Sequence, residues 1–268
     1  MRNPCLLATA ALTALWASTA IATDGDALSE VKHQLQQGVD HGDVAQVLEA
    51  RARFQVLVEN APRSALPAYW VAVADWRAAA LLLNGAHPNR EQARRHCEAG
   101  IAAAERALAL DPKFGGALAV KVGLQGLSTT FLPPAILMTL GPQMESDLAR
   151  ARRLSTEDPR VSLLDGMNTL HKPAFVGGGP RPALAKLEHA IEQFAAERPT
   201  DPAAPDWGRD DAYLWAGRAA MQLGEPALAR RFFVRALEAN PDHAWVRGTL
   251  LPEAERAMAA DSTEQGVP

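Results

Sequence analysis

Cysteine and tyrosine are nearly missing from this sequence of 268 residues, which contains two of each. The chain also lacks an excess of positive charge, since 27 lysines and arginines stand against 31 aspartates and glutamates, for a net charge of −4. A mildly acidic chain is a poor candidate for a nucleic-acid-binding protein, which needs clustered positive charge. Hydrophobic residues make up 48% of the sequence, which suffices for a sizeable core and excludes a largely disordered chain.

Common catalytic and metal-binding motifs are also missing. The sequence contains no G-x-S-x-G, no H-E-x-x-H and no C-x-x-C pattern. Adjacent carboxylates such as Asp210 and Asp211 lie near a predicted helix start, where the helix dipole favours them without any acid–base chemistry. We therefore expect a protein that is not an enzyme and that holds neither a metal nor another cofactor.

The N-terminus has the pattern of a secretory signal peptide over residues 1–22. Arg2 precedes an uncharged, mostly apolar run from Leu6 to Ala17, and Ala20-Ile21-Ala22 fits the A-x-A cleavage pattern. The apolar run is too short for a transmembrane helix, although an uncleaved anchor or a buried helix stays an alternative. We expect a periplasmic protein without a membrane span after cleavage. Cys97 is then the one remaining cysteine, and we expect it to lie in the middle of a helix as a small packed side chain.

Two segments near the two ends of the chain share one spacing. Small, small, aromatic and proline residues follow one another with gaps of 12, 4 and 8, at Gly38, Ala50, Phe54 and Pro62 and again at Gly217, Ala229, Phe233 and Pro241. The spacing has a physical reason. A small residue in one helix lets a second helix cross closely, an aromatic side chain fills the space between them, and proline ends the second helix. Weaker copies lie between the two segments.

These residues resemble the tetratricopeptide repeat (TPR) family, most clearly over residues 213–241 and 38–62. The resemblance implies an all-α, right-handed solenoid over residues 23–260, with about five antiparallel helix pairs and a C-terminal capping helix. Residues 261–268 are expected to form a disordered tail. The loop Phe175–Gly179 is similar to a Phe-x-Gly-Gly-Gly loop in exported bacterial proteins of this kind. We interpret its glycines as a tight turn, with a backbone cradle for an anion as the alternative.

Helices are predicted over eleven segments, at residues 28–38, 43–59, 66–83, 90–110, 114–128, 143–155, 160–170, 181–197, 210–223, 226–239 and 244–259. The alternation of apolar and polar residues that indicates a strand is missing. Three segments interrupt the repeat, at residues 84–90, 128–142 and 198–209. Trp207, in the last of them, is expected to dock on the helices, because a fully exposed tryptophan is unfavourable.

The resemblance also implies a concave surface, lined by the first helix of each pair, that binds peptides or protein segments. The repeat register places the following residues on it: Tyr69, Trp76, Arg77, Arg160, Leu163, Met167, His171, Asp211, Leu214, Arg218 and Gln222. Aromatic and arginine side chains are the usual anchors of interfaces, although several of these residues would be merely packed or solvated. We therefore expect a periplasmic scaffold or adaptor for a protein or peptide partner in the cell envelope. A homo-oligomer stays open.

An uncharged stretch from Val122 to Met144 is the second candidate site. Prolines 133, 134 and 142 argue against a membrane-spanning helix there. Either the stretch packs on the core, or it exposes an apolar patch made of Phe131, Leu132, Ile136, Leu137 and Met138. The patch favours the alternative function, a small-molecule or lipid-binding accessory component of an envelope transporter. An enclosed apolar cavity, in place of an open groove, would favour that alternative.

Overall fold

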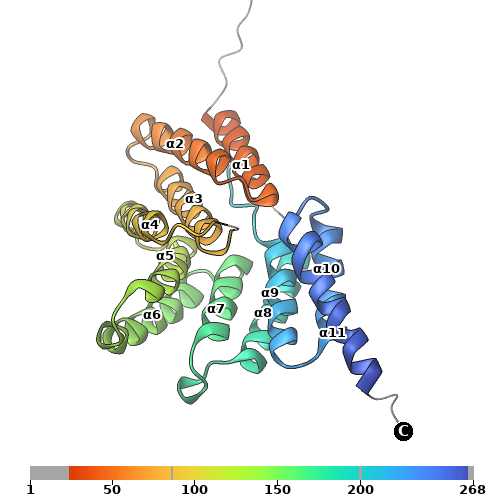
Figure 1. The fold of residues 1–268 in the computed structure, drawn as a ribbon. Helices are drawn as coiled ribbons and strands as arrows, with labels where there is room; N and C mark the ends of the chain where they lie inside the picture. The colour runs from red at the N-terminus through yellow and green to blue at the C-terminus, as the bar shows by residue number, and fades with distance from the viewer. Residues whose placement is uncertain (1–23, 86, 199–200, 265–268) are drawn as a thin grey trace, which may run out of the picture.

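The computed structural model describes residues 24–85, 87–198 and 201–264, and in that part of the chain it is an all-α solenoid without strands (Figure 1). Five antiparallel pairs follow one another: α1 (Asp24–His41) with α2 (Val44–Asn60), α3 (Ala65–Asn84) with α4 (Arg90–Leu110), α5 (Gly115–Ser128) with α6 (Pro134–Leu154), α7 (Pro159–His171) with α8 (Pro180–Ala196), and α9 (Arg209–Gln222) with α10 (Pro226–Ala239). A short π-helical stretch, η3 (Val246–Leu250), leads into α11 (Leu251–Glu264). The predicted all-α repeat fold is confirmed.

Glycine allows the close helix crossings on which the repeat pattern depends. A Cβ added at Gly217 would collide with the ring of Phe233, so the aromatic of α10 rests directly on the glycine of α9. At Gly166 an added Cβ would come within 2.7 Å of Leu187 Cγ, and at Gly38 within 2.9 Å of Val47 Cγ2. The small residues of α1, α7 and α9 therefore perform the predicted packing role, although in the first and fourth pairs an aliphatic side chain takes the place of the aromatic one.

Helix α6 begins earlier than the sequence predicted. The expected start was residue 143, because Gly141 and Pro142 looked like helix breakers, but the helix starts at Pro134 and continues through Pro142. Pro134 stands at the first helical position, where its missing N–H costs nothing. Pro142 removes one backbone hydrogen bond without ending the helix. Two 3₁₀ turns, η1 (Thr129–Phe131) and η2 (Ala174–Val176), connect the helices of the third and fourth pairs.

The two ends of the chain outside the repeats can be compared with the predictions only in part. The predicted signal peptide, residues 1–22, lies outside the described residues. Helix α11 continues to Glu264 and is longer than the predicted capping helix. The first four residues of the predicted disordered tail, 261–264, are therefore helical. Residues 265–268 lie outside the described part of the chain.

The solenoid curls until its ends touch. Figure 1 shows the helix pairs on an arc that brings α9 and α10 back toward α1. The side-chain amide of Asn240, after α10, donates hydrogen bonds to Asp40 of α1 and to Asp210 of α9, both at 2.7 Å. Helix α3 lies inside this arc. By length and composition it is apolar enough to cross a membrane, but 78% of its apolar window is buried in the protein, as expected of a core helix.

Candidate functional site

An inner loop, residues 201–208, covers part of the concave face. Trp207 is only 4% exposed, and its indole Nε1 donates a hydrogen bond to the hydroxyl of Tyr69 at 2.9 Å. A Cβ added at Gly208 would lie 3.1 Å from Leu163 Cδ2, so the loop also contacts α7. The prediction that Trp207 docks on the helices is confirmed. Burial, followed by the charge of Asp158, raises the pKa of Tyr69, so this phenol stays a neutral hydrogen-bonding group.

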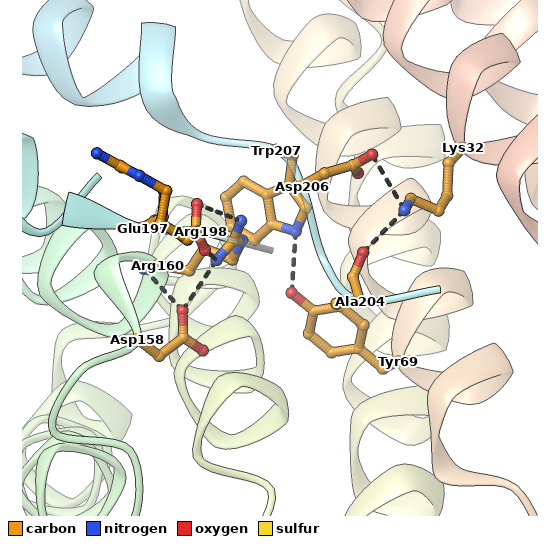
Figure 2. Close-up of polar contacts among 9 residues, drawn as sticks. All are labelled: Lys32, Tyr69, Asp158, Arg160, Glu197, Arg198, Ala204, Asp206 and Trp207. Carbon is orange, nitrogen blue, oxygen red and sulfur yellow. Dashed lines mark hydrogen bonds and ion pairs between the residues drawn. The ribbon is translucent and has the colours of Figure 1, made fainter. Parts of the chain in front are cut away.

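Polar contacts hold this loop and the end of α8, which precedes it in the chain (Figure 2). The ammonium of Lys32 in α1 donates to the carbonyls of Pro202 and Ala204 at 2.7 and 2.8 Å, and it pairs with Asp206 at 3.0 Å. On the other side, Arg160 of α7 pairs with Glu197 at 2.6 Å. Together with the contacts of Trp207 with α3 and of Gly208 with α7, the contacts of Lys32 hold the loop against the helices, so this part of the concave face is filled by the chain itself.

Next to the loop lies a buried cluster of one arginine, two tryptophans and one aspartate. The guanidinium of Arg77 in α3 lies 4.5 Å from the ring centroid of Trp76 and 5.2 Å from that of Trp207. It makes a two-pronged pair with Asp211 of α9, in which Nη1 donates to Oδ1 at 2.9 Å. Burial works to raise the pKa of Asp211, but the charge and hydrogen bonds of Arg77 outweigh it and hold that pKa below the ordinary value. The cluster is a fully paired ionic contact between two repeats.

Asp210 lies beside this pair, and its role differs from the one expected. The two adjacent aspartates do stand in the first turn of α9, as predicted from the helix dipole. Both are buried, however, and each has a specific partner, Arg77 for Asp211 and Asn240 for Asp210. Burial, followed by the neighbouring charge of Asp211, raises the pKa of Asp210. The pair therefore helps to close the ring of repeats, which sequence spacing does not reveal.

The rest of the concave face contains a partly open cavity of about 790 Å³ between α3, α5, α7, α9 and the segment His243–Trp245. This volume lies in the range of small-molecule sites. Most of its lining is apolar or aromatic, including Leu81, Leu83, Val122, Leu127, Leu164, Met167, Leu214, Trp76, Trp215 and Trp245. The cavity lies on the inner side of the repeats, beyond the part that the inner loop fills.

A second arginine–tryptophan cluster stands in the wall of this cavity. The guanidinium of Arg218 lies 4.5 Å from the ring centroid of Trp215 and 5.3 Å from that of Trp245. In the described part of the chain it makes no hydrogen bond and no ion pair. Burial lowers the pKa of Arg218, and the charge of Glu253 opposes that shift only in part. Since arginine stays charged in proteins, the cavity contains a cation that no described residue pairs with.

Two histidines add polar groups to the cavity wall. The ring of His171 stands edge-on to Trp215, with 5.6 Å between centroids. Burial of the imidazole, followed by the charge of Arg218, lowers the pKa of His171 and favours its neutral form. His243 is 6% exposed, and its Nδ1 has no hydrogen-bond partner among the described residues. The described residues contain no group of three or more His, Cys, Asp and Glu residues placed to hold a metal ion.

Most of the predicted groove residues lie in one of the two parts of the concave face. Those that line the cavity are Trp76, Arg77, Met167, His171, Asp211, Leu214 and Arg218. Tyr69 and Leu163 are buried against the inner loop, and Arg160 is buried in its ion pairs with Glu197 and Asp158. Gln222 is exposed at the end of α9 and does not line the cavity. The structure therefore corrects the picture of one continuous open groove.

Sequence reasoning missed two of the cavity's aromatic residues, Trp215 and Trp245. A signal was present for Trp215, because it stands three residues before Arg218 on a helix, where side chains share a face. No comparable signal existed for Trp245, whose position depends on how the chain returns after α10.

The predicted apolar patch is only partly exposed. Ile136 and Met138 are 47% and 78% exposed, whereas the other members, Phe131, Leu132 and Leu137, are half-buried. The beginning of the uncharged stretch lies elsewhere, since Val122 and Leu127 line the cavity. The stretch therefore packs inside the protein at its beginning and exposes apolar side chains at Ile136 and Met138.

The Gly-Gly-Gly segment forms the tight turn that was predicted. Gly177 and Gly179 have φ values of +82° and +107°, which favour glycine. An L side chain at Gly178 would collide with the carbonyl of Lys172. The N–H of Gly178 donates to the carbonyl of Pro173 at 3.1 Å, and that of Gly179 to Thr169 at 2.9 Å. These donors are used by carbonyls of the turn and of α7, so they do not form an anion cradle.

Cys97 is a buried, unpaired cysteine on α4, as predicted. Burial raises its pKa to about 11, which keeps the thiol protonated. A protonated, inaccessible thiol is a poor nucleophile, so this residue acts in packing.

Comparisons with known proteins agree with the fold. No protein-family model and no curated protein sequence matches the chain. Among solved structures, the HusA haemophore from Porphyromonas gingivalis is similar with a TM-score of 0.60 and 20% identity, over 77% of this chain and 96% of that one. A thermophilic TPR protein from Thermus thermophilus is similar with a TM-score of 0.58 and 15% identity, over 85% of this chain and 99% of that one. The chain therefore has a TPR-like, all-helical fold shared by a repeat protein and a haemophore.

Proposed function

We propose that this protein is a non-catalytic carrier that holds a small, apolar, ring-containing molecule in its concave cavity. The observation that carries the proposal is the cavity itself, of about 790 Å³ with three tryptophans in its wall. Binding needs no chemistry on the ligand, because burial of apolar surface and ring stacking supply the free energy.

The filled part of the concave face supports a small ligand over a long peptide. An extended peptide that follows all five repeats would displace Trp207 and the inner loop, and so break the hydrogen bond to Tyr69 and the contacts of Lys32. A small molecule fits the remaining cavity without any of these losses. Preformed sites bind with less ordering cost, which favours the compact ligand.

The structural similarity to a haemophore suggests the first ligand class to test. A haemophore binds haem, and the flat, largely apolar ring of a tetrapyrrole suits a wall built from Trp76, Trp215 and Trp245. Protoporphyrin IX and its dimethyl ester are therefore the probes of choice, because they show whether the cavity accepts the ring without requiring iron.

The test is a titration of the mature protein, residues 23–268, with each probe, in which quenching of tryptophan fluorescence reports binding. We expect saturable binding at one site. Ala80→Trp, which places a bulky side chain in the cavity lining, should weaken binding at least about tenfold by excluding the ring. Ala102→Trp on the exposed surface of α4 is the matched control and should bind like the native protein. The proposal is wrong if neither probe saturates, or if Ala80→Trp leaves binding unchanged.

A protein partner in the cell envelope is the second candidate function. It is favoured by four exposed apolar residues near the connections within the third and fourth pairs, Ile136, Met138, Phe175 and Val176, of which Phe175 is 89% exposed. Ile136 and Met138 lie near the start of α6, and Phe175 and Val176 lie in η2; exposed apolar side chains of this kind are typical of interaction surfaces. Crosslinking in a native periplasm with the protein and with Met138→Ser plus Phe175→Ser tests this. Only a partner that the double variant loses would support it.

The periplasmic location is part of the same proposal. It rests on the signal-peptide pattern of residues 1–22, and N-terminal sequencing of exported protein should give Thr23 as the first residue. An intact N-terminus on exported material would contradict the predicted cleavage site.

A further inference from the structure

The two arginine–tryptophan clusters of the concave face are built alike but are paired differently. Arg77 lies against Trp76 and Trp207 and forms its ion pair with Asp211. Arg218 lies against Trp215 and Trp245 and has no anion of the described chain within ion-pair distance. Stacked arginine presents its N–H donors at the edge of the guanidinium plane, where a carboxylate accepts two of them.

Arg218 is distinct from the other charged residues in the cavity lining. Asp40 accepts hydrogen bonds from Gln36 and Asn240, and Arg90 donates to the carbonyl of Thr130. Arg77 and Asp211 satisfy each other. Among the charged residues of the cavity lining, Arg218 is thus the one whose side-chain N–H groups donate no hydrogen bond to the described part of the chain.

The surroundings of Arg218 favour an anion from outside the chain. Its stacking on two rings replaces part of its hydration, and burial disfavours its charge. The nearest acidic influence, Glu253 of α11, forms no ion pair with it. His171 is held in its neutral form, so it does not supply a competing cation beside the guanidinium. An unpaired cation in a partly desolvated wall binds an anionic group more strongly than an exposed arginine would.

We propose that Arg218 is the anchor for a carboxylate of the cavity's ligand, so that the ligand class is an apolar ring system that bears a carboxylate. The ring occupies the apolar cavity, and the carboxylate accepts hydrogen bonds from Arg218 between Trp215 and Trp245. This inference rests on the proposed function, since it names the ligand class of the same cavity.

Protoporphyrin IX and its dimethyl ester test the anchor, because they share the ring and differ in the two carboxylates. The native protein should bind the free acid roughly 10- to 100-fold more tightly than the ester. Arg218→Gln should remove that difference by weakening only the free acid, and Arg218→Lys should keep part of it as a point charge. Arg235→Gln is the matched control, because Arg235 lies 5.7 Å from the ring centroid of Tyr213 and pairs with Glu238 outside the cavity.

The outcomes separate the two proposals. If the native protein binds acid and ester equally, or if Arg218→Gln keeps the preference for the acid, the anchor is wrong while the cavity proposal stands. If Arg218→Gln weakens both probes equally, Arg218 acts in packing and the anchor is also wrong. If the native protein binds neither probe, the proposed function itself fails. Thermal unfolding of each variant, followed by circular dichroism, shows that the comparison is made on folded protein.

Discussion

Two arginines on the inner side of this solenoid occupy nearly the same environment and have opposite roles. Arg77 and Arg218 each lie against two tryptophan rings. Helix α9 supplies both Asp211, which pairs with Arg77, and Arg218 itself, two turns further along the same helix. The difference is the counterion: the chain provides one for Arg77 and, in its described part, none for Arg218.

The comparison teaches how to distinguish a structural cation from a binding one on a repeat scaffold. A buried charge that is fully paired within the chain holds repeats together, and its loss costs stability. A partly buried charge without a partner costs stability and is available to a ligand. Residue type and helix register do not separate the two cases, whereas hydrogen-bond accounting does.

The largest expected effect comes from breaking the paired cluster. Asp211→Asn removes the negative charge and leaves the buried Arg77 without the carboxylate that pairs with it directly, so the free energy of unfolding should fall by about 3–5 kcal/mol. Urea unfolding followed by circular dichroism measures it. Glu255→Gln, which breaks the exposed pair with Arg230 at 3.2 Å, is the control and should cost less than about 1 kcal/mol. Equal costs for the two variants would show that the Arg77 cluster does not stabilise the ring.

A smaller effect is expected from a substitution in α9, the helix that contains both Asp211 and Arg218. Gly217→Ala places a Cβ against the ring of Phe233, and overpacking should lower the free energy of unfolding by about 1–3 kcal/mol. Gly248→Ala is the control, since an added Cβ there meets nothing within 4 Å. Thermal melts of both variants decide the matter. Unchanged stability of Gly217→Ala would contradict the assigned crossing of α9 and α10.

The smallest expected effect concerns His171 beside the unpaired arginine. Its pKa in the folded protein lies below the ordinary value of 6.5, so the unfolded chain binds a proton more readily. The corresponding stability is present above pH 6.5 and is lost as the pH falls below it. Urea unfolding at about pH 7.5 and about pH 5.5 should therefore show a smaller pH dependence for His171→Gln than for the native protein. Arg218→Gln should also reduce the pH dependence, because this substitution removes the positive charge that lowers the pKa of His171. A larger pH dependence in either variant would contradict this account.

Much of the fold was predictable because its determinants are local. The spacing of glycine, alanine, phenylalanine and proline along a pair reports how two adjacent helices cross, and the structure confirms the predicted contact of Gly217 with Phe233. The prediction was wrong at the start of α6, where proline was taken as a break. Helix α6 continues through Pro142 with one backbone hydrogen bond fewer, and all of its buried residues follow that proline, so a proline in a short window of sequence does not show whether a helix ends there.

The candidate site was predictable as a set of residues but not as a geometry. The register placed seven of the named residues on what is now the cavity lining, among them Arg218 and His171. It did not indicate that Tyr69 would be covered or that Arg77 would be neutralised. Both depend on segments more than a hundred residues away, with separations of 138 for Trp207 with Tyr69 and 134 for Asp211 with Arg77.

By itself, the sequence determined the helices, their pairing and the repeat order, because hydrophobic periodicity, small residues and helix-ending prolines act over a few turns. Only the tertiary structure decided which residues of the concave face are paired within the chain and which can contact a ligand. The small rotation from each pair to the next adds up until the ends meet, and this sum brings Asp211 to Arg77 and the inner loop to Tyr69. The same curvature leaves Arg218 facing a cavity without a partner from the described chain.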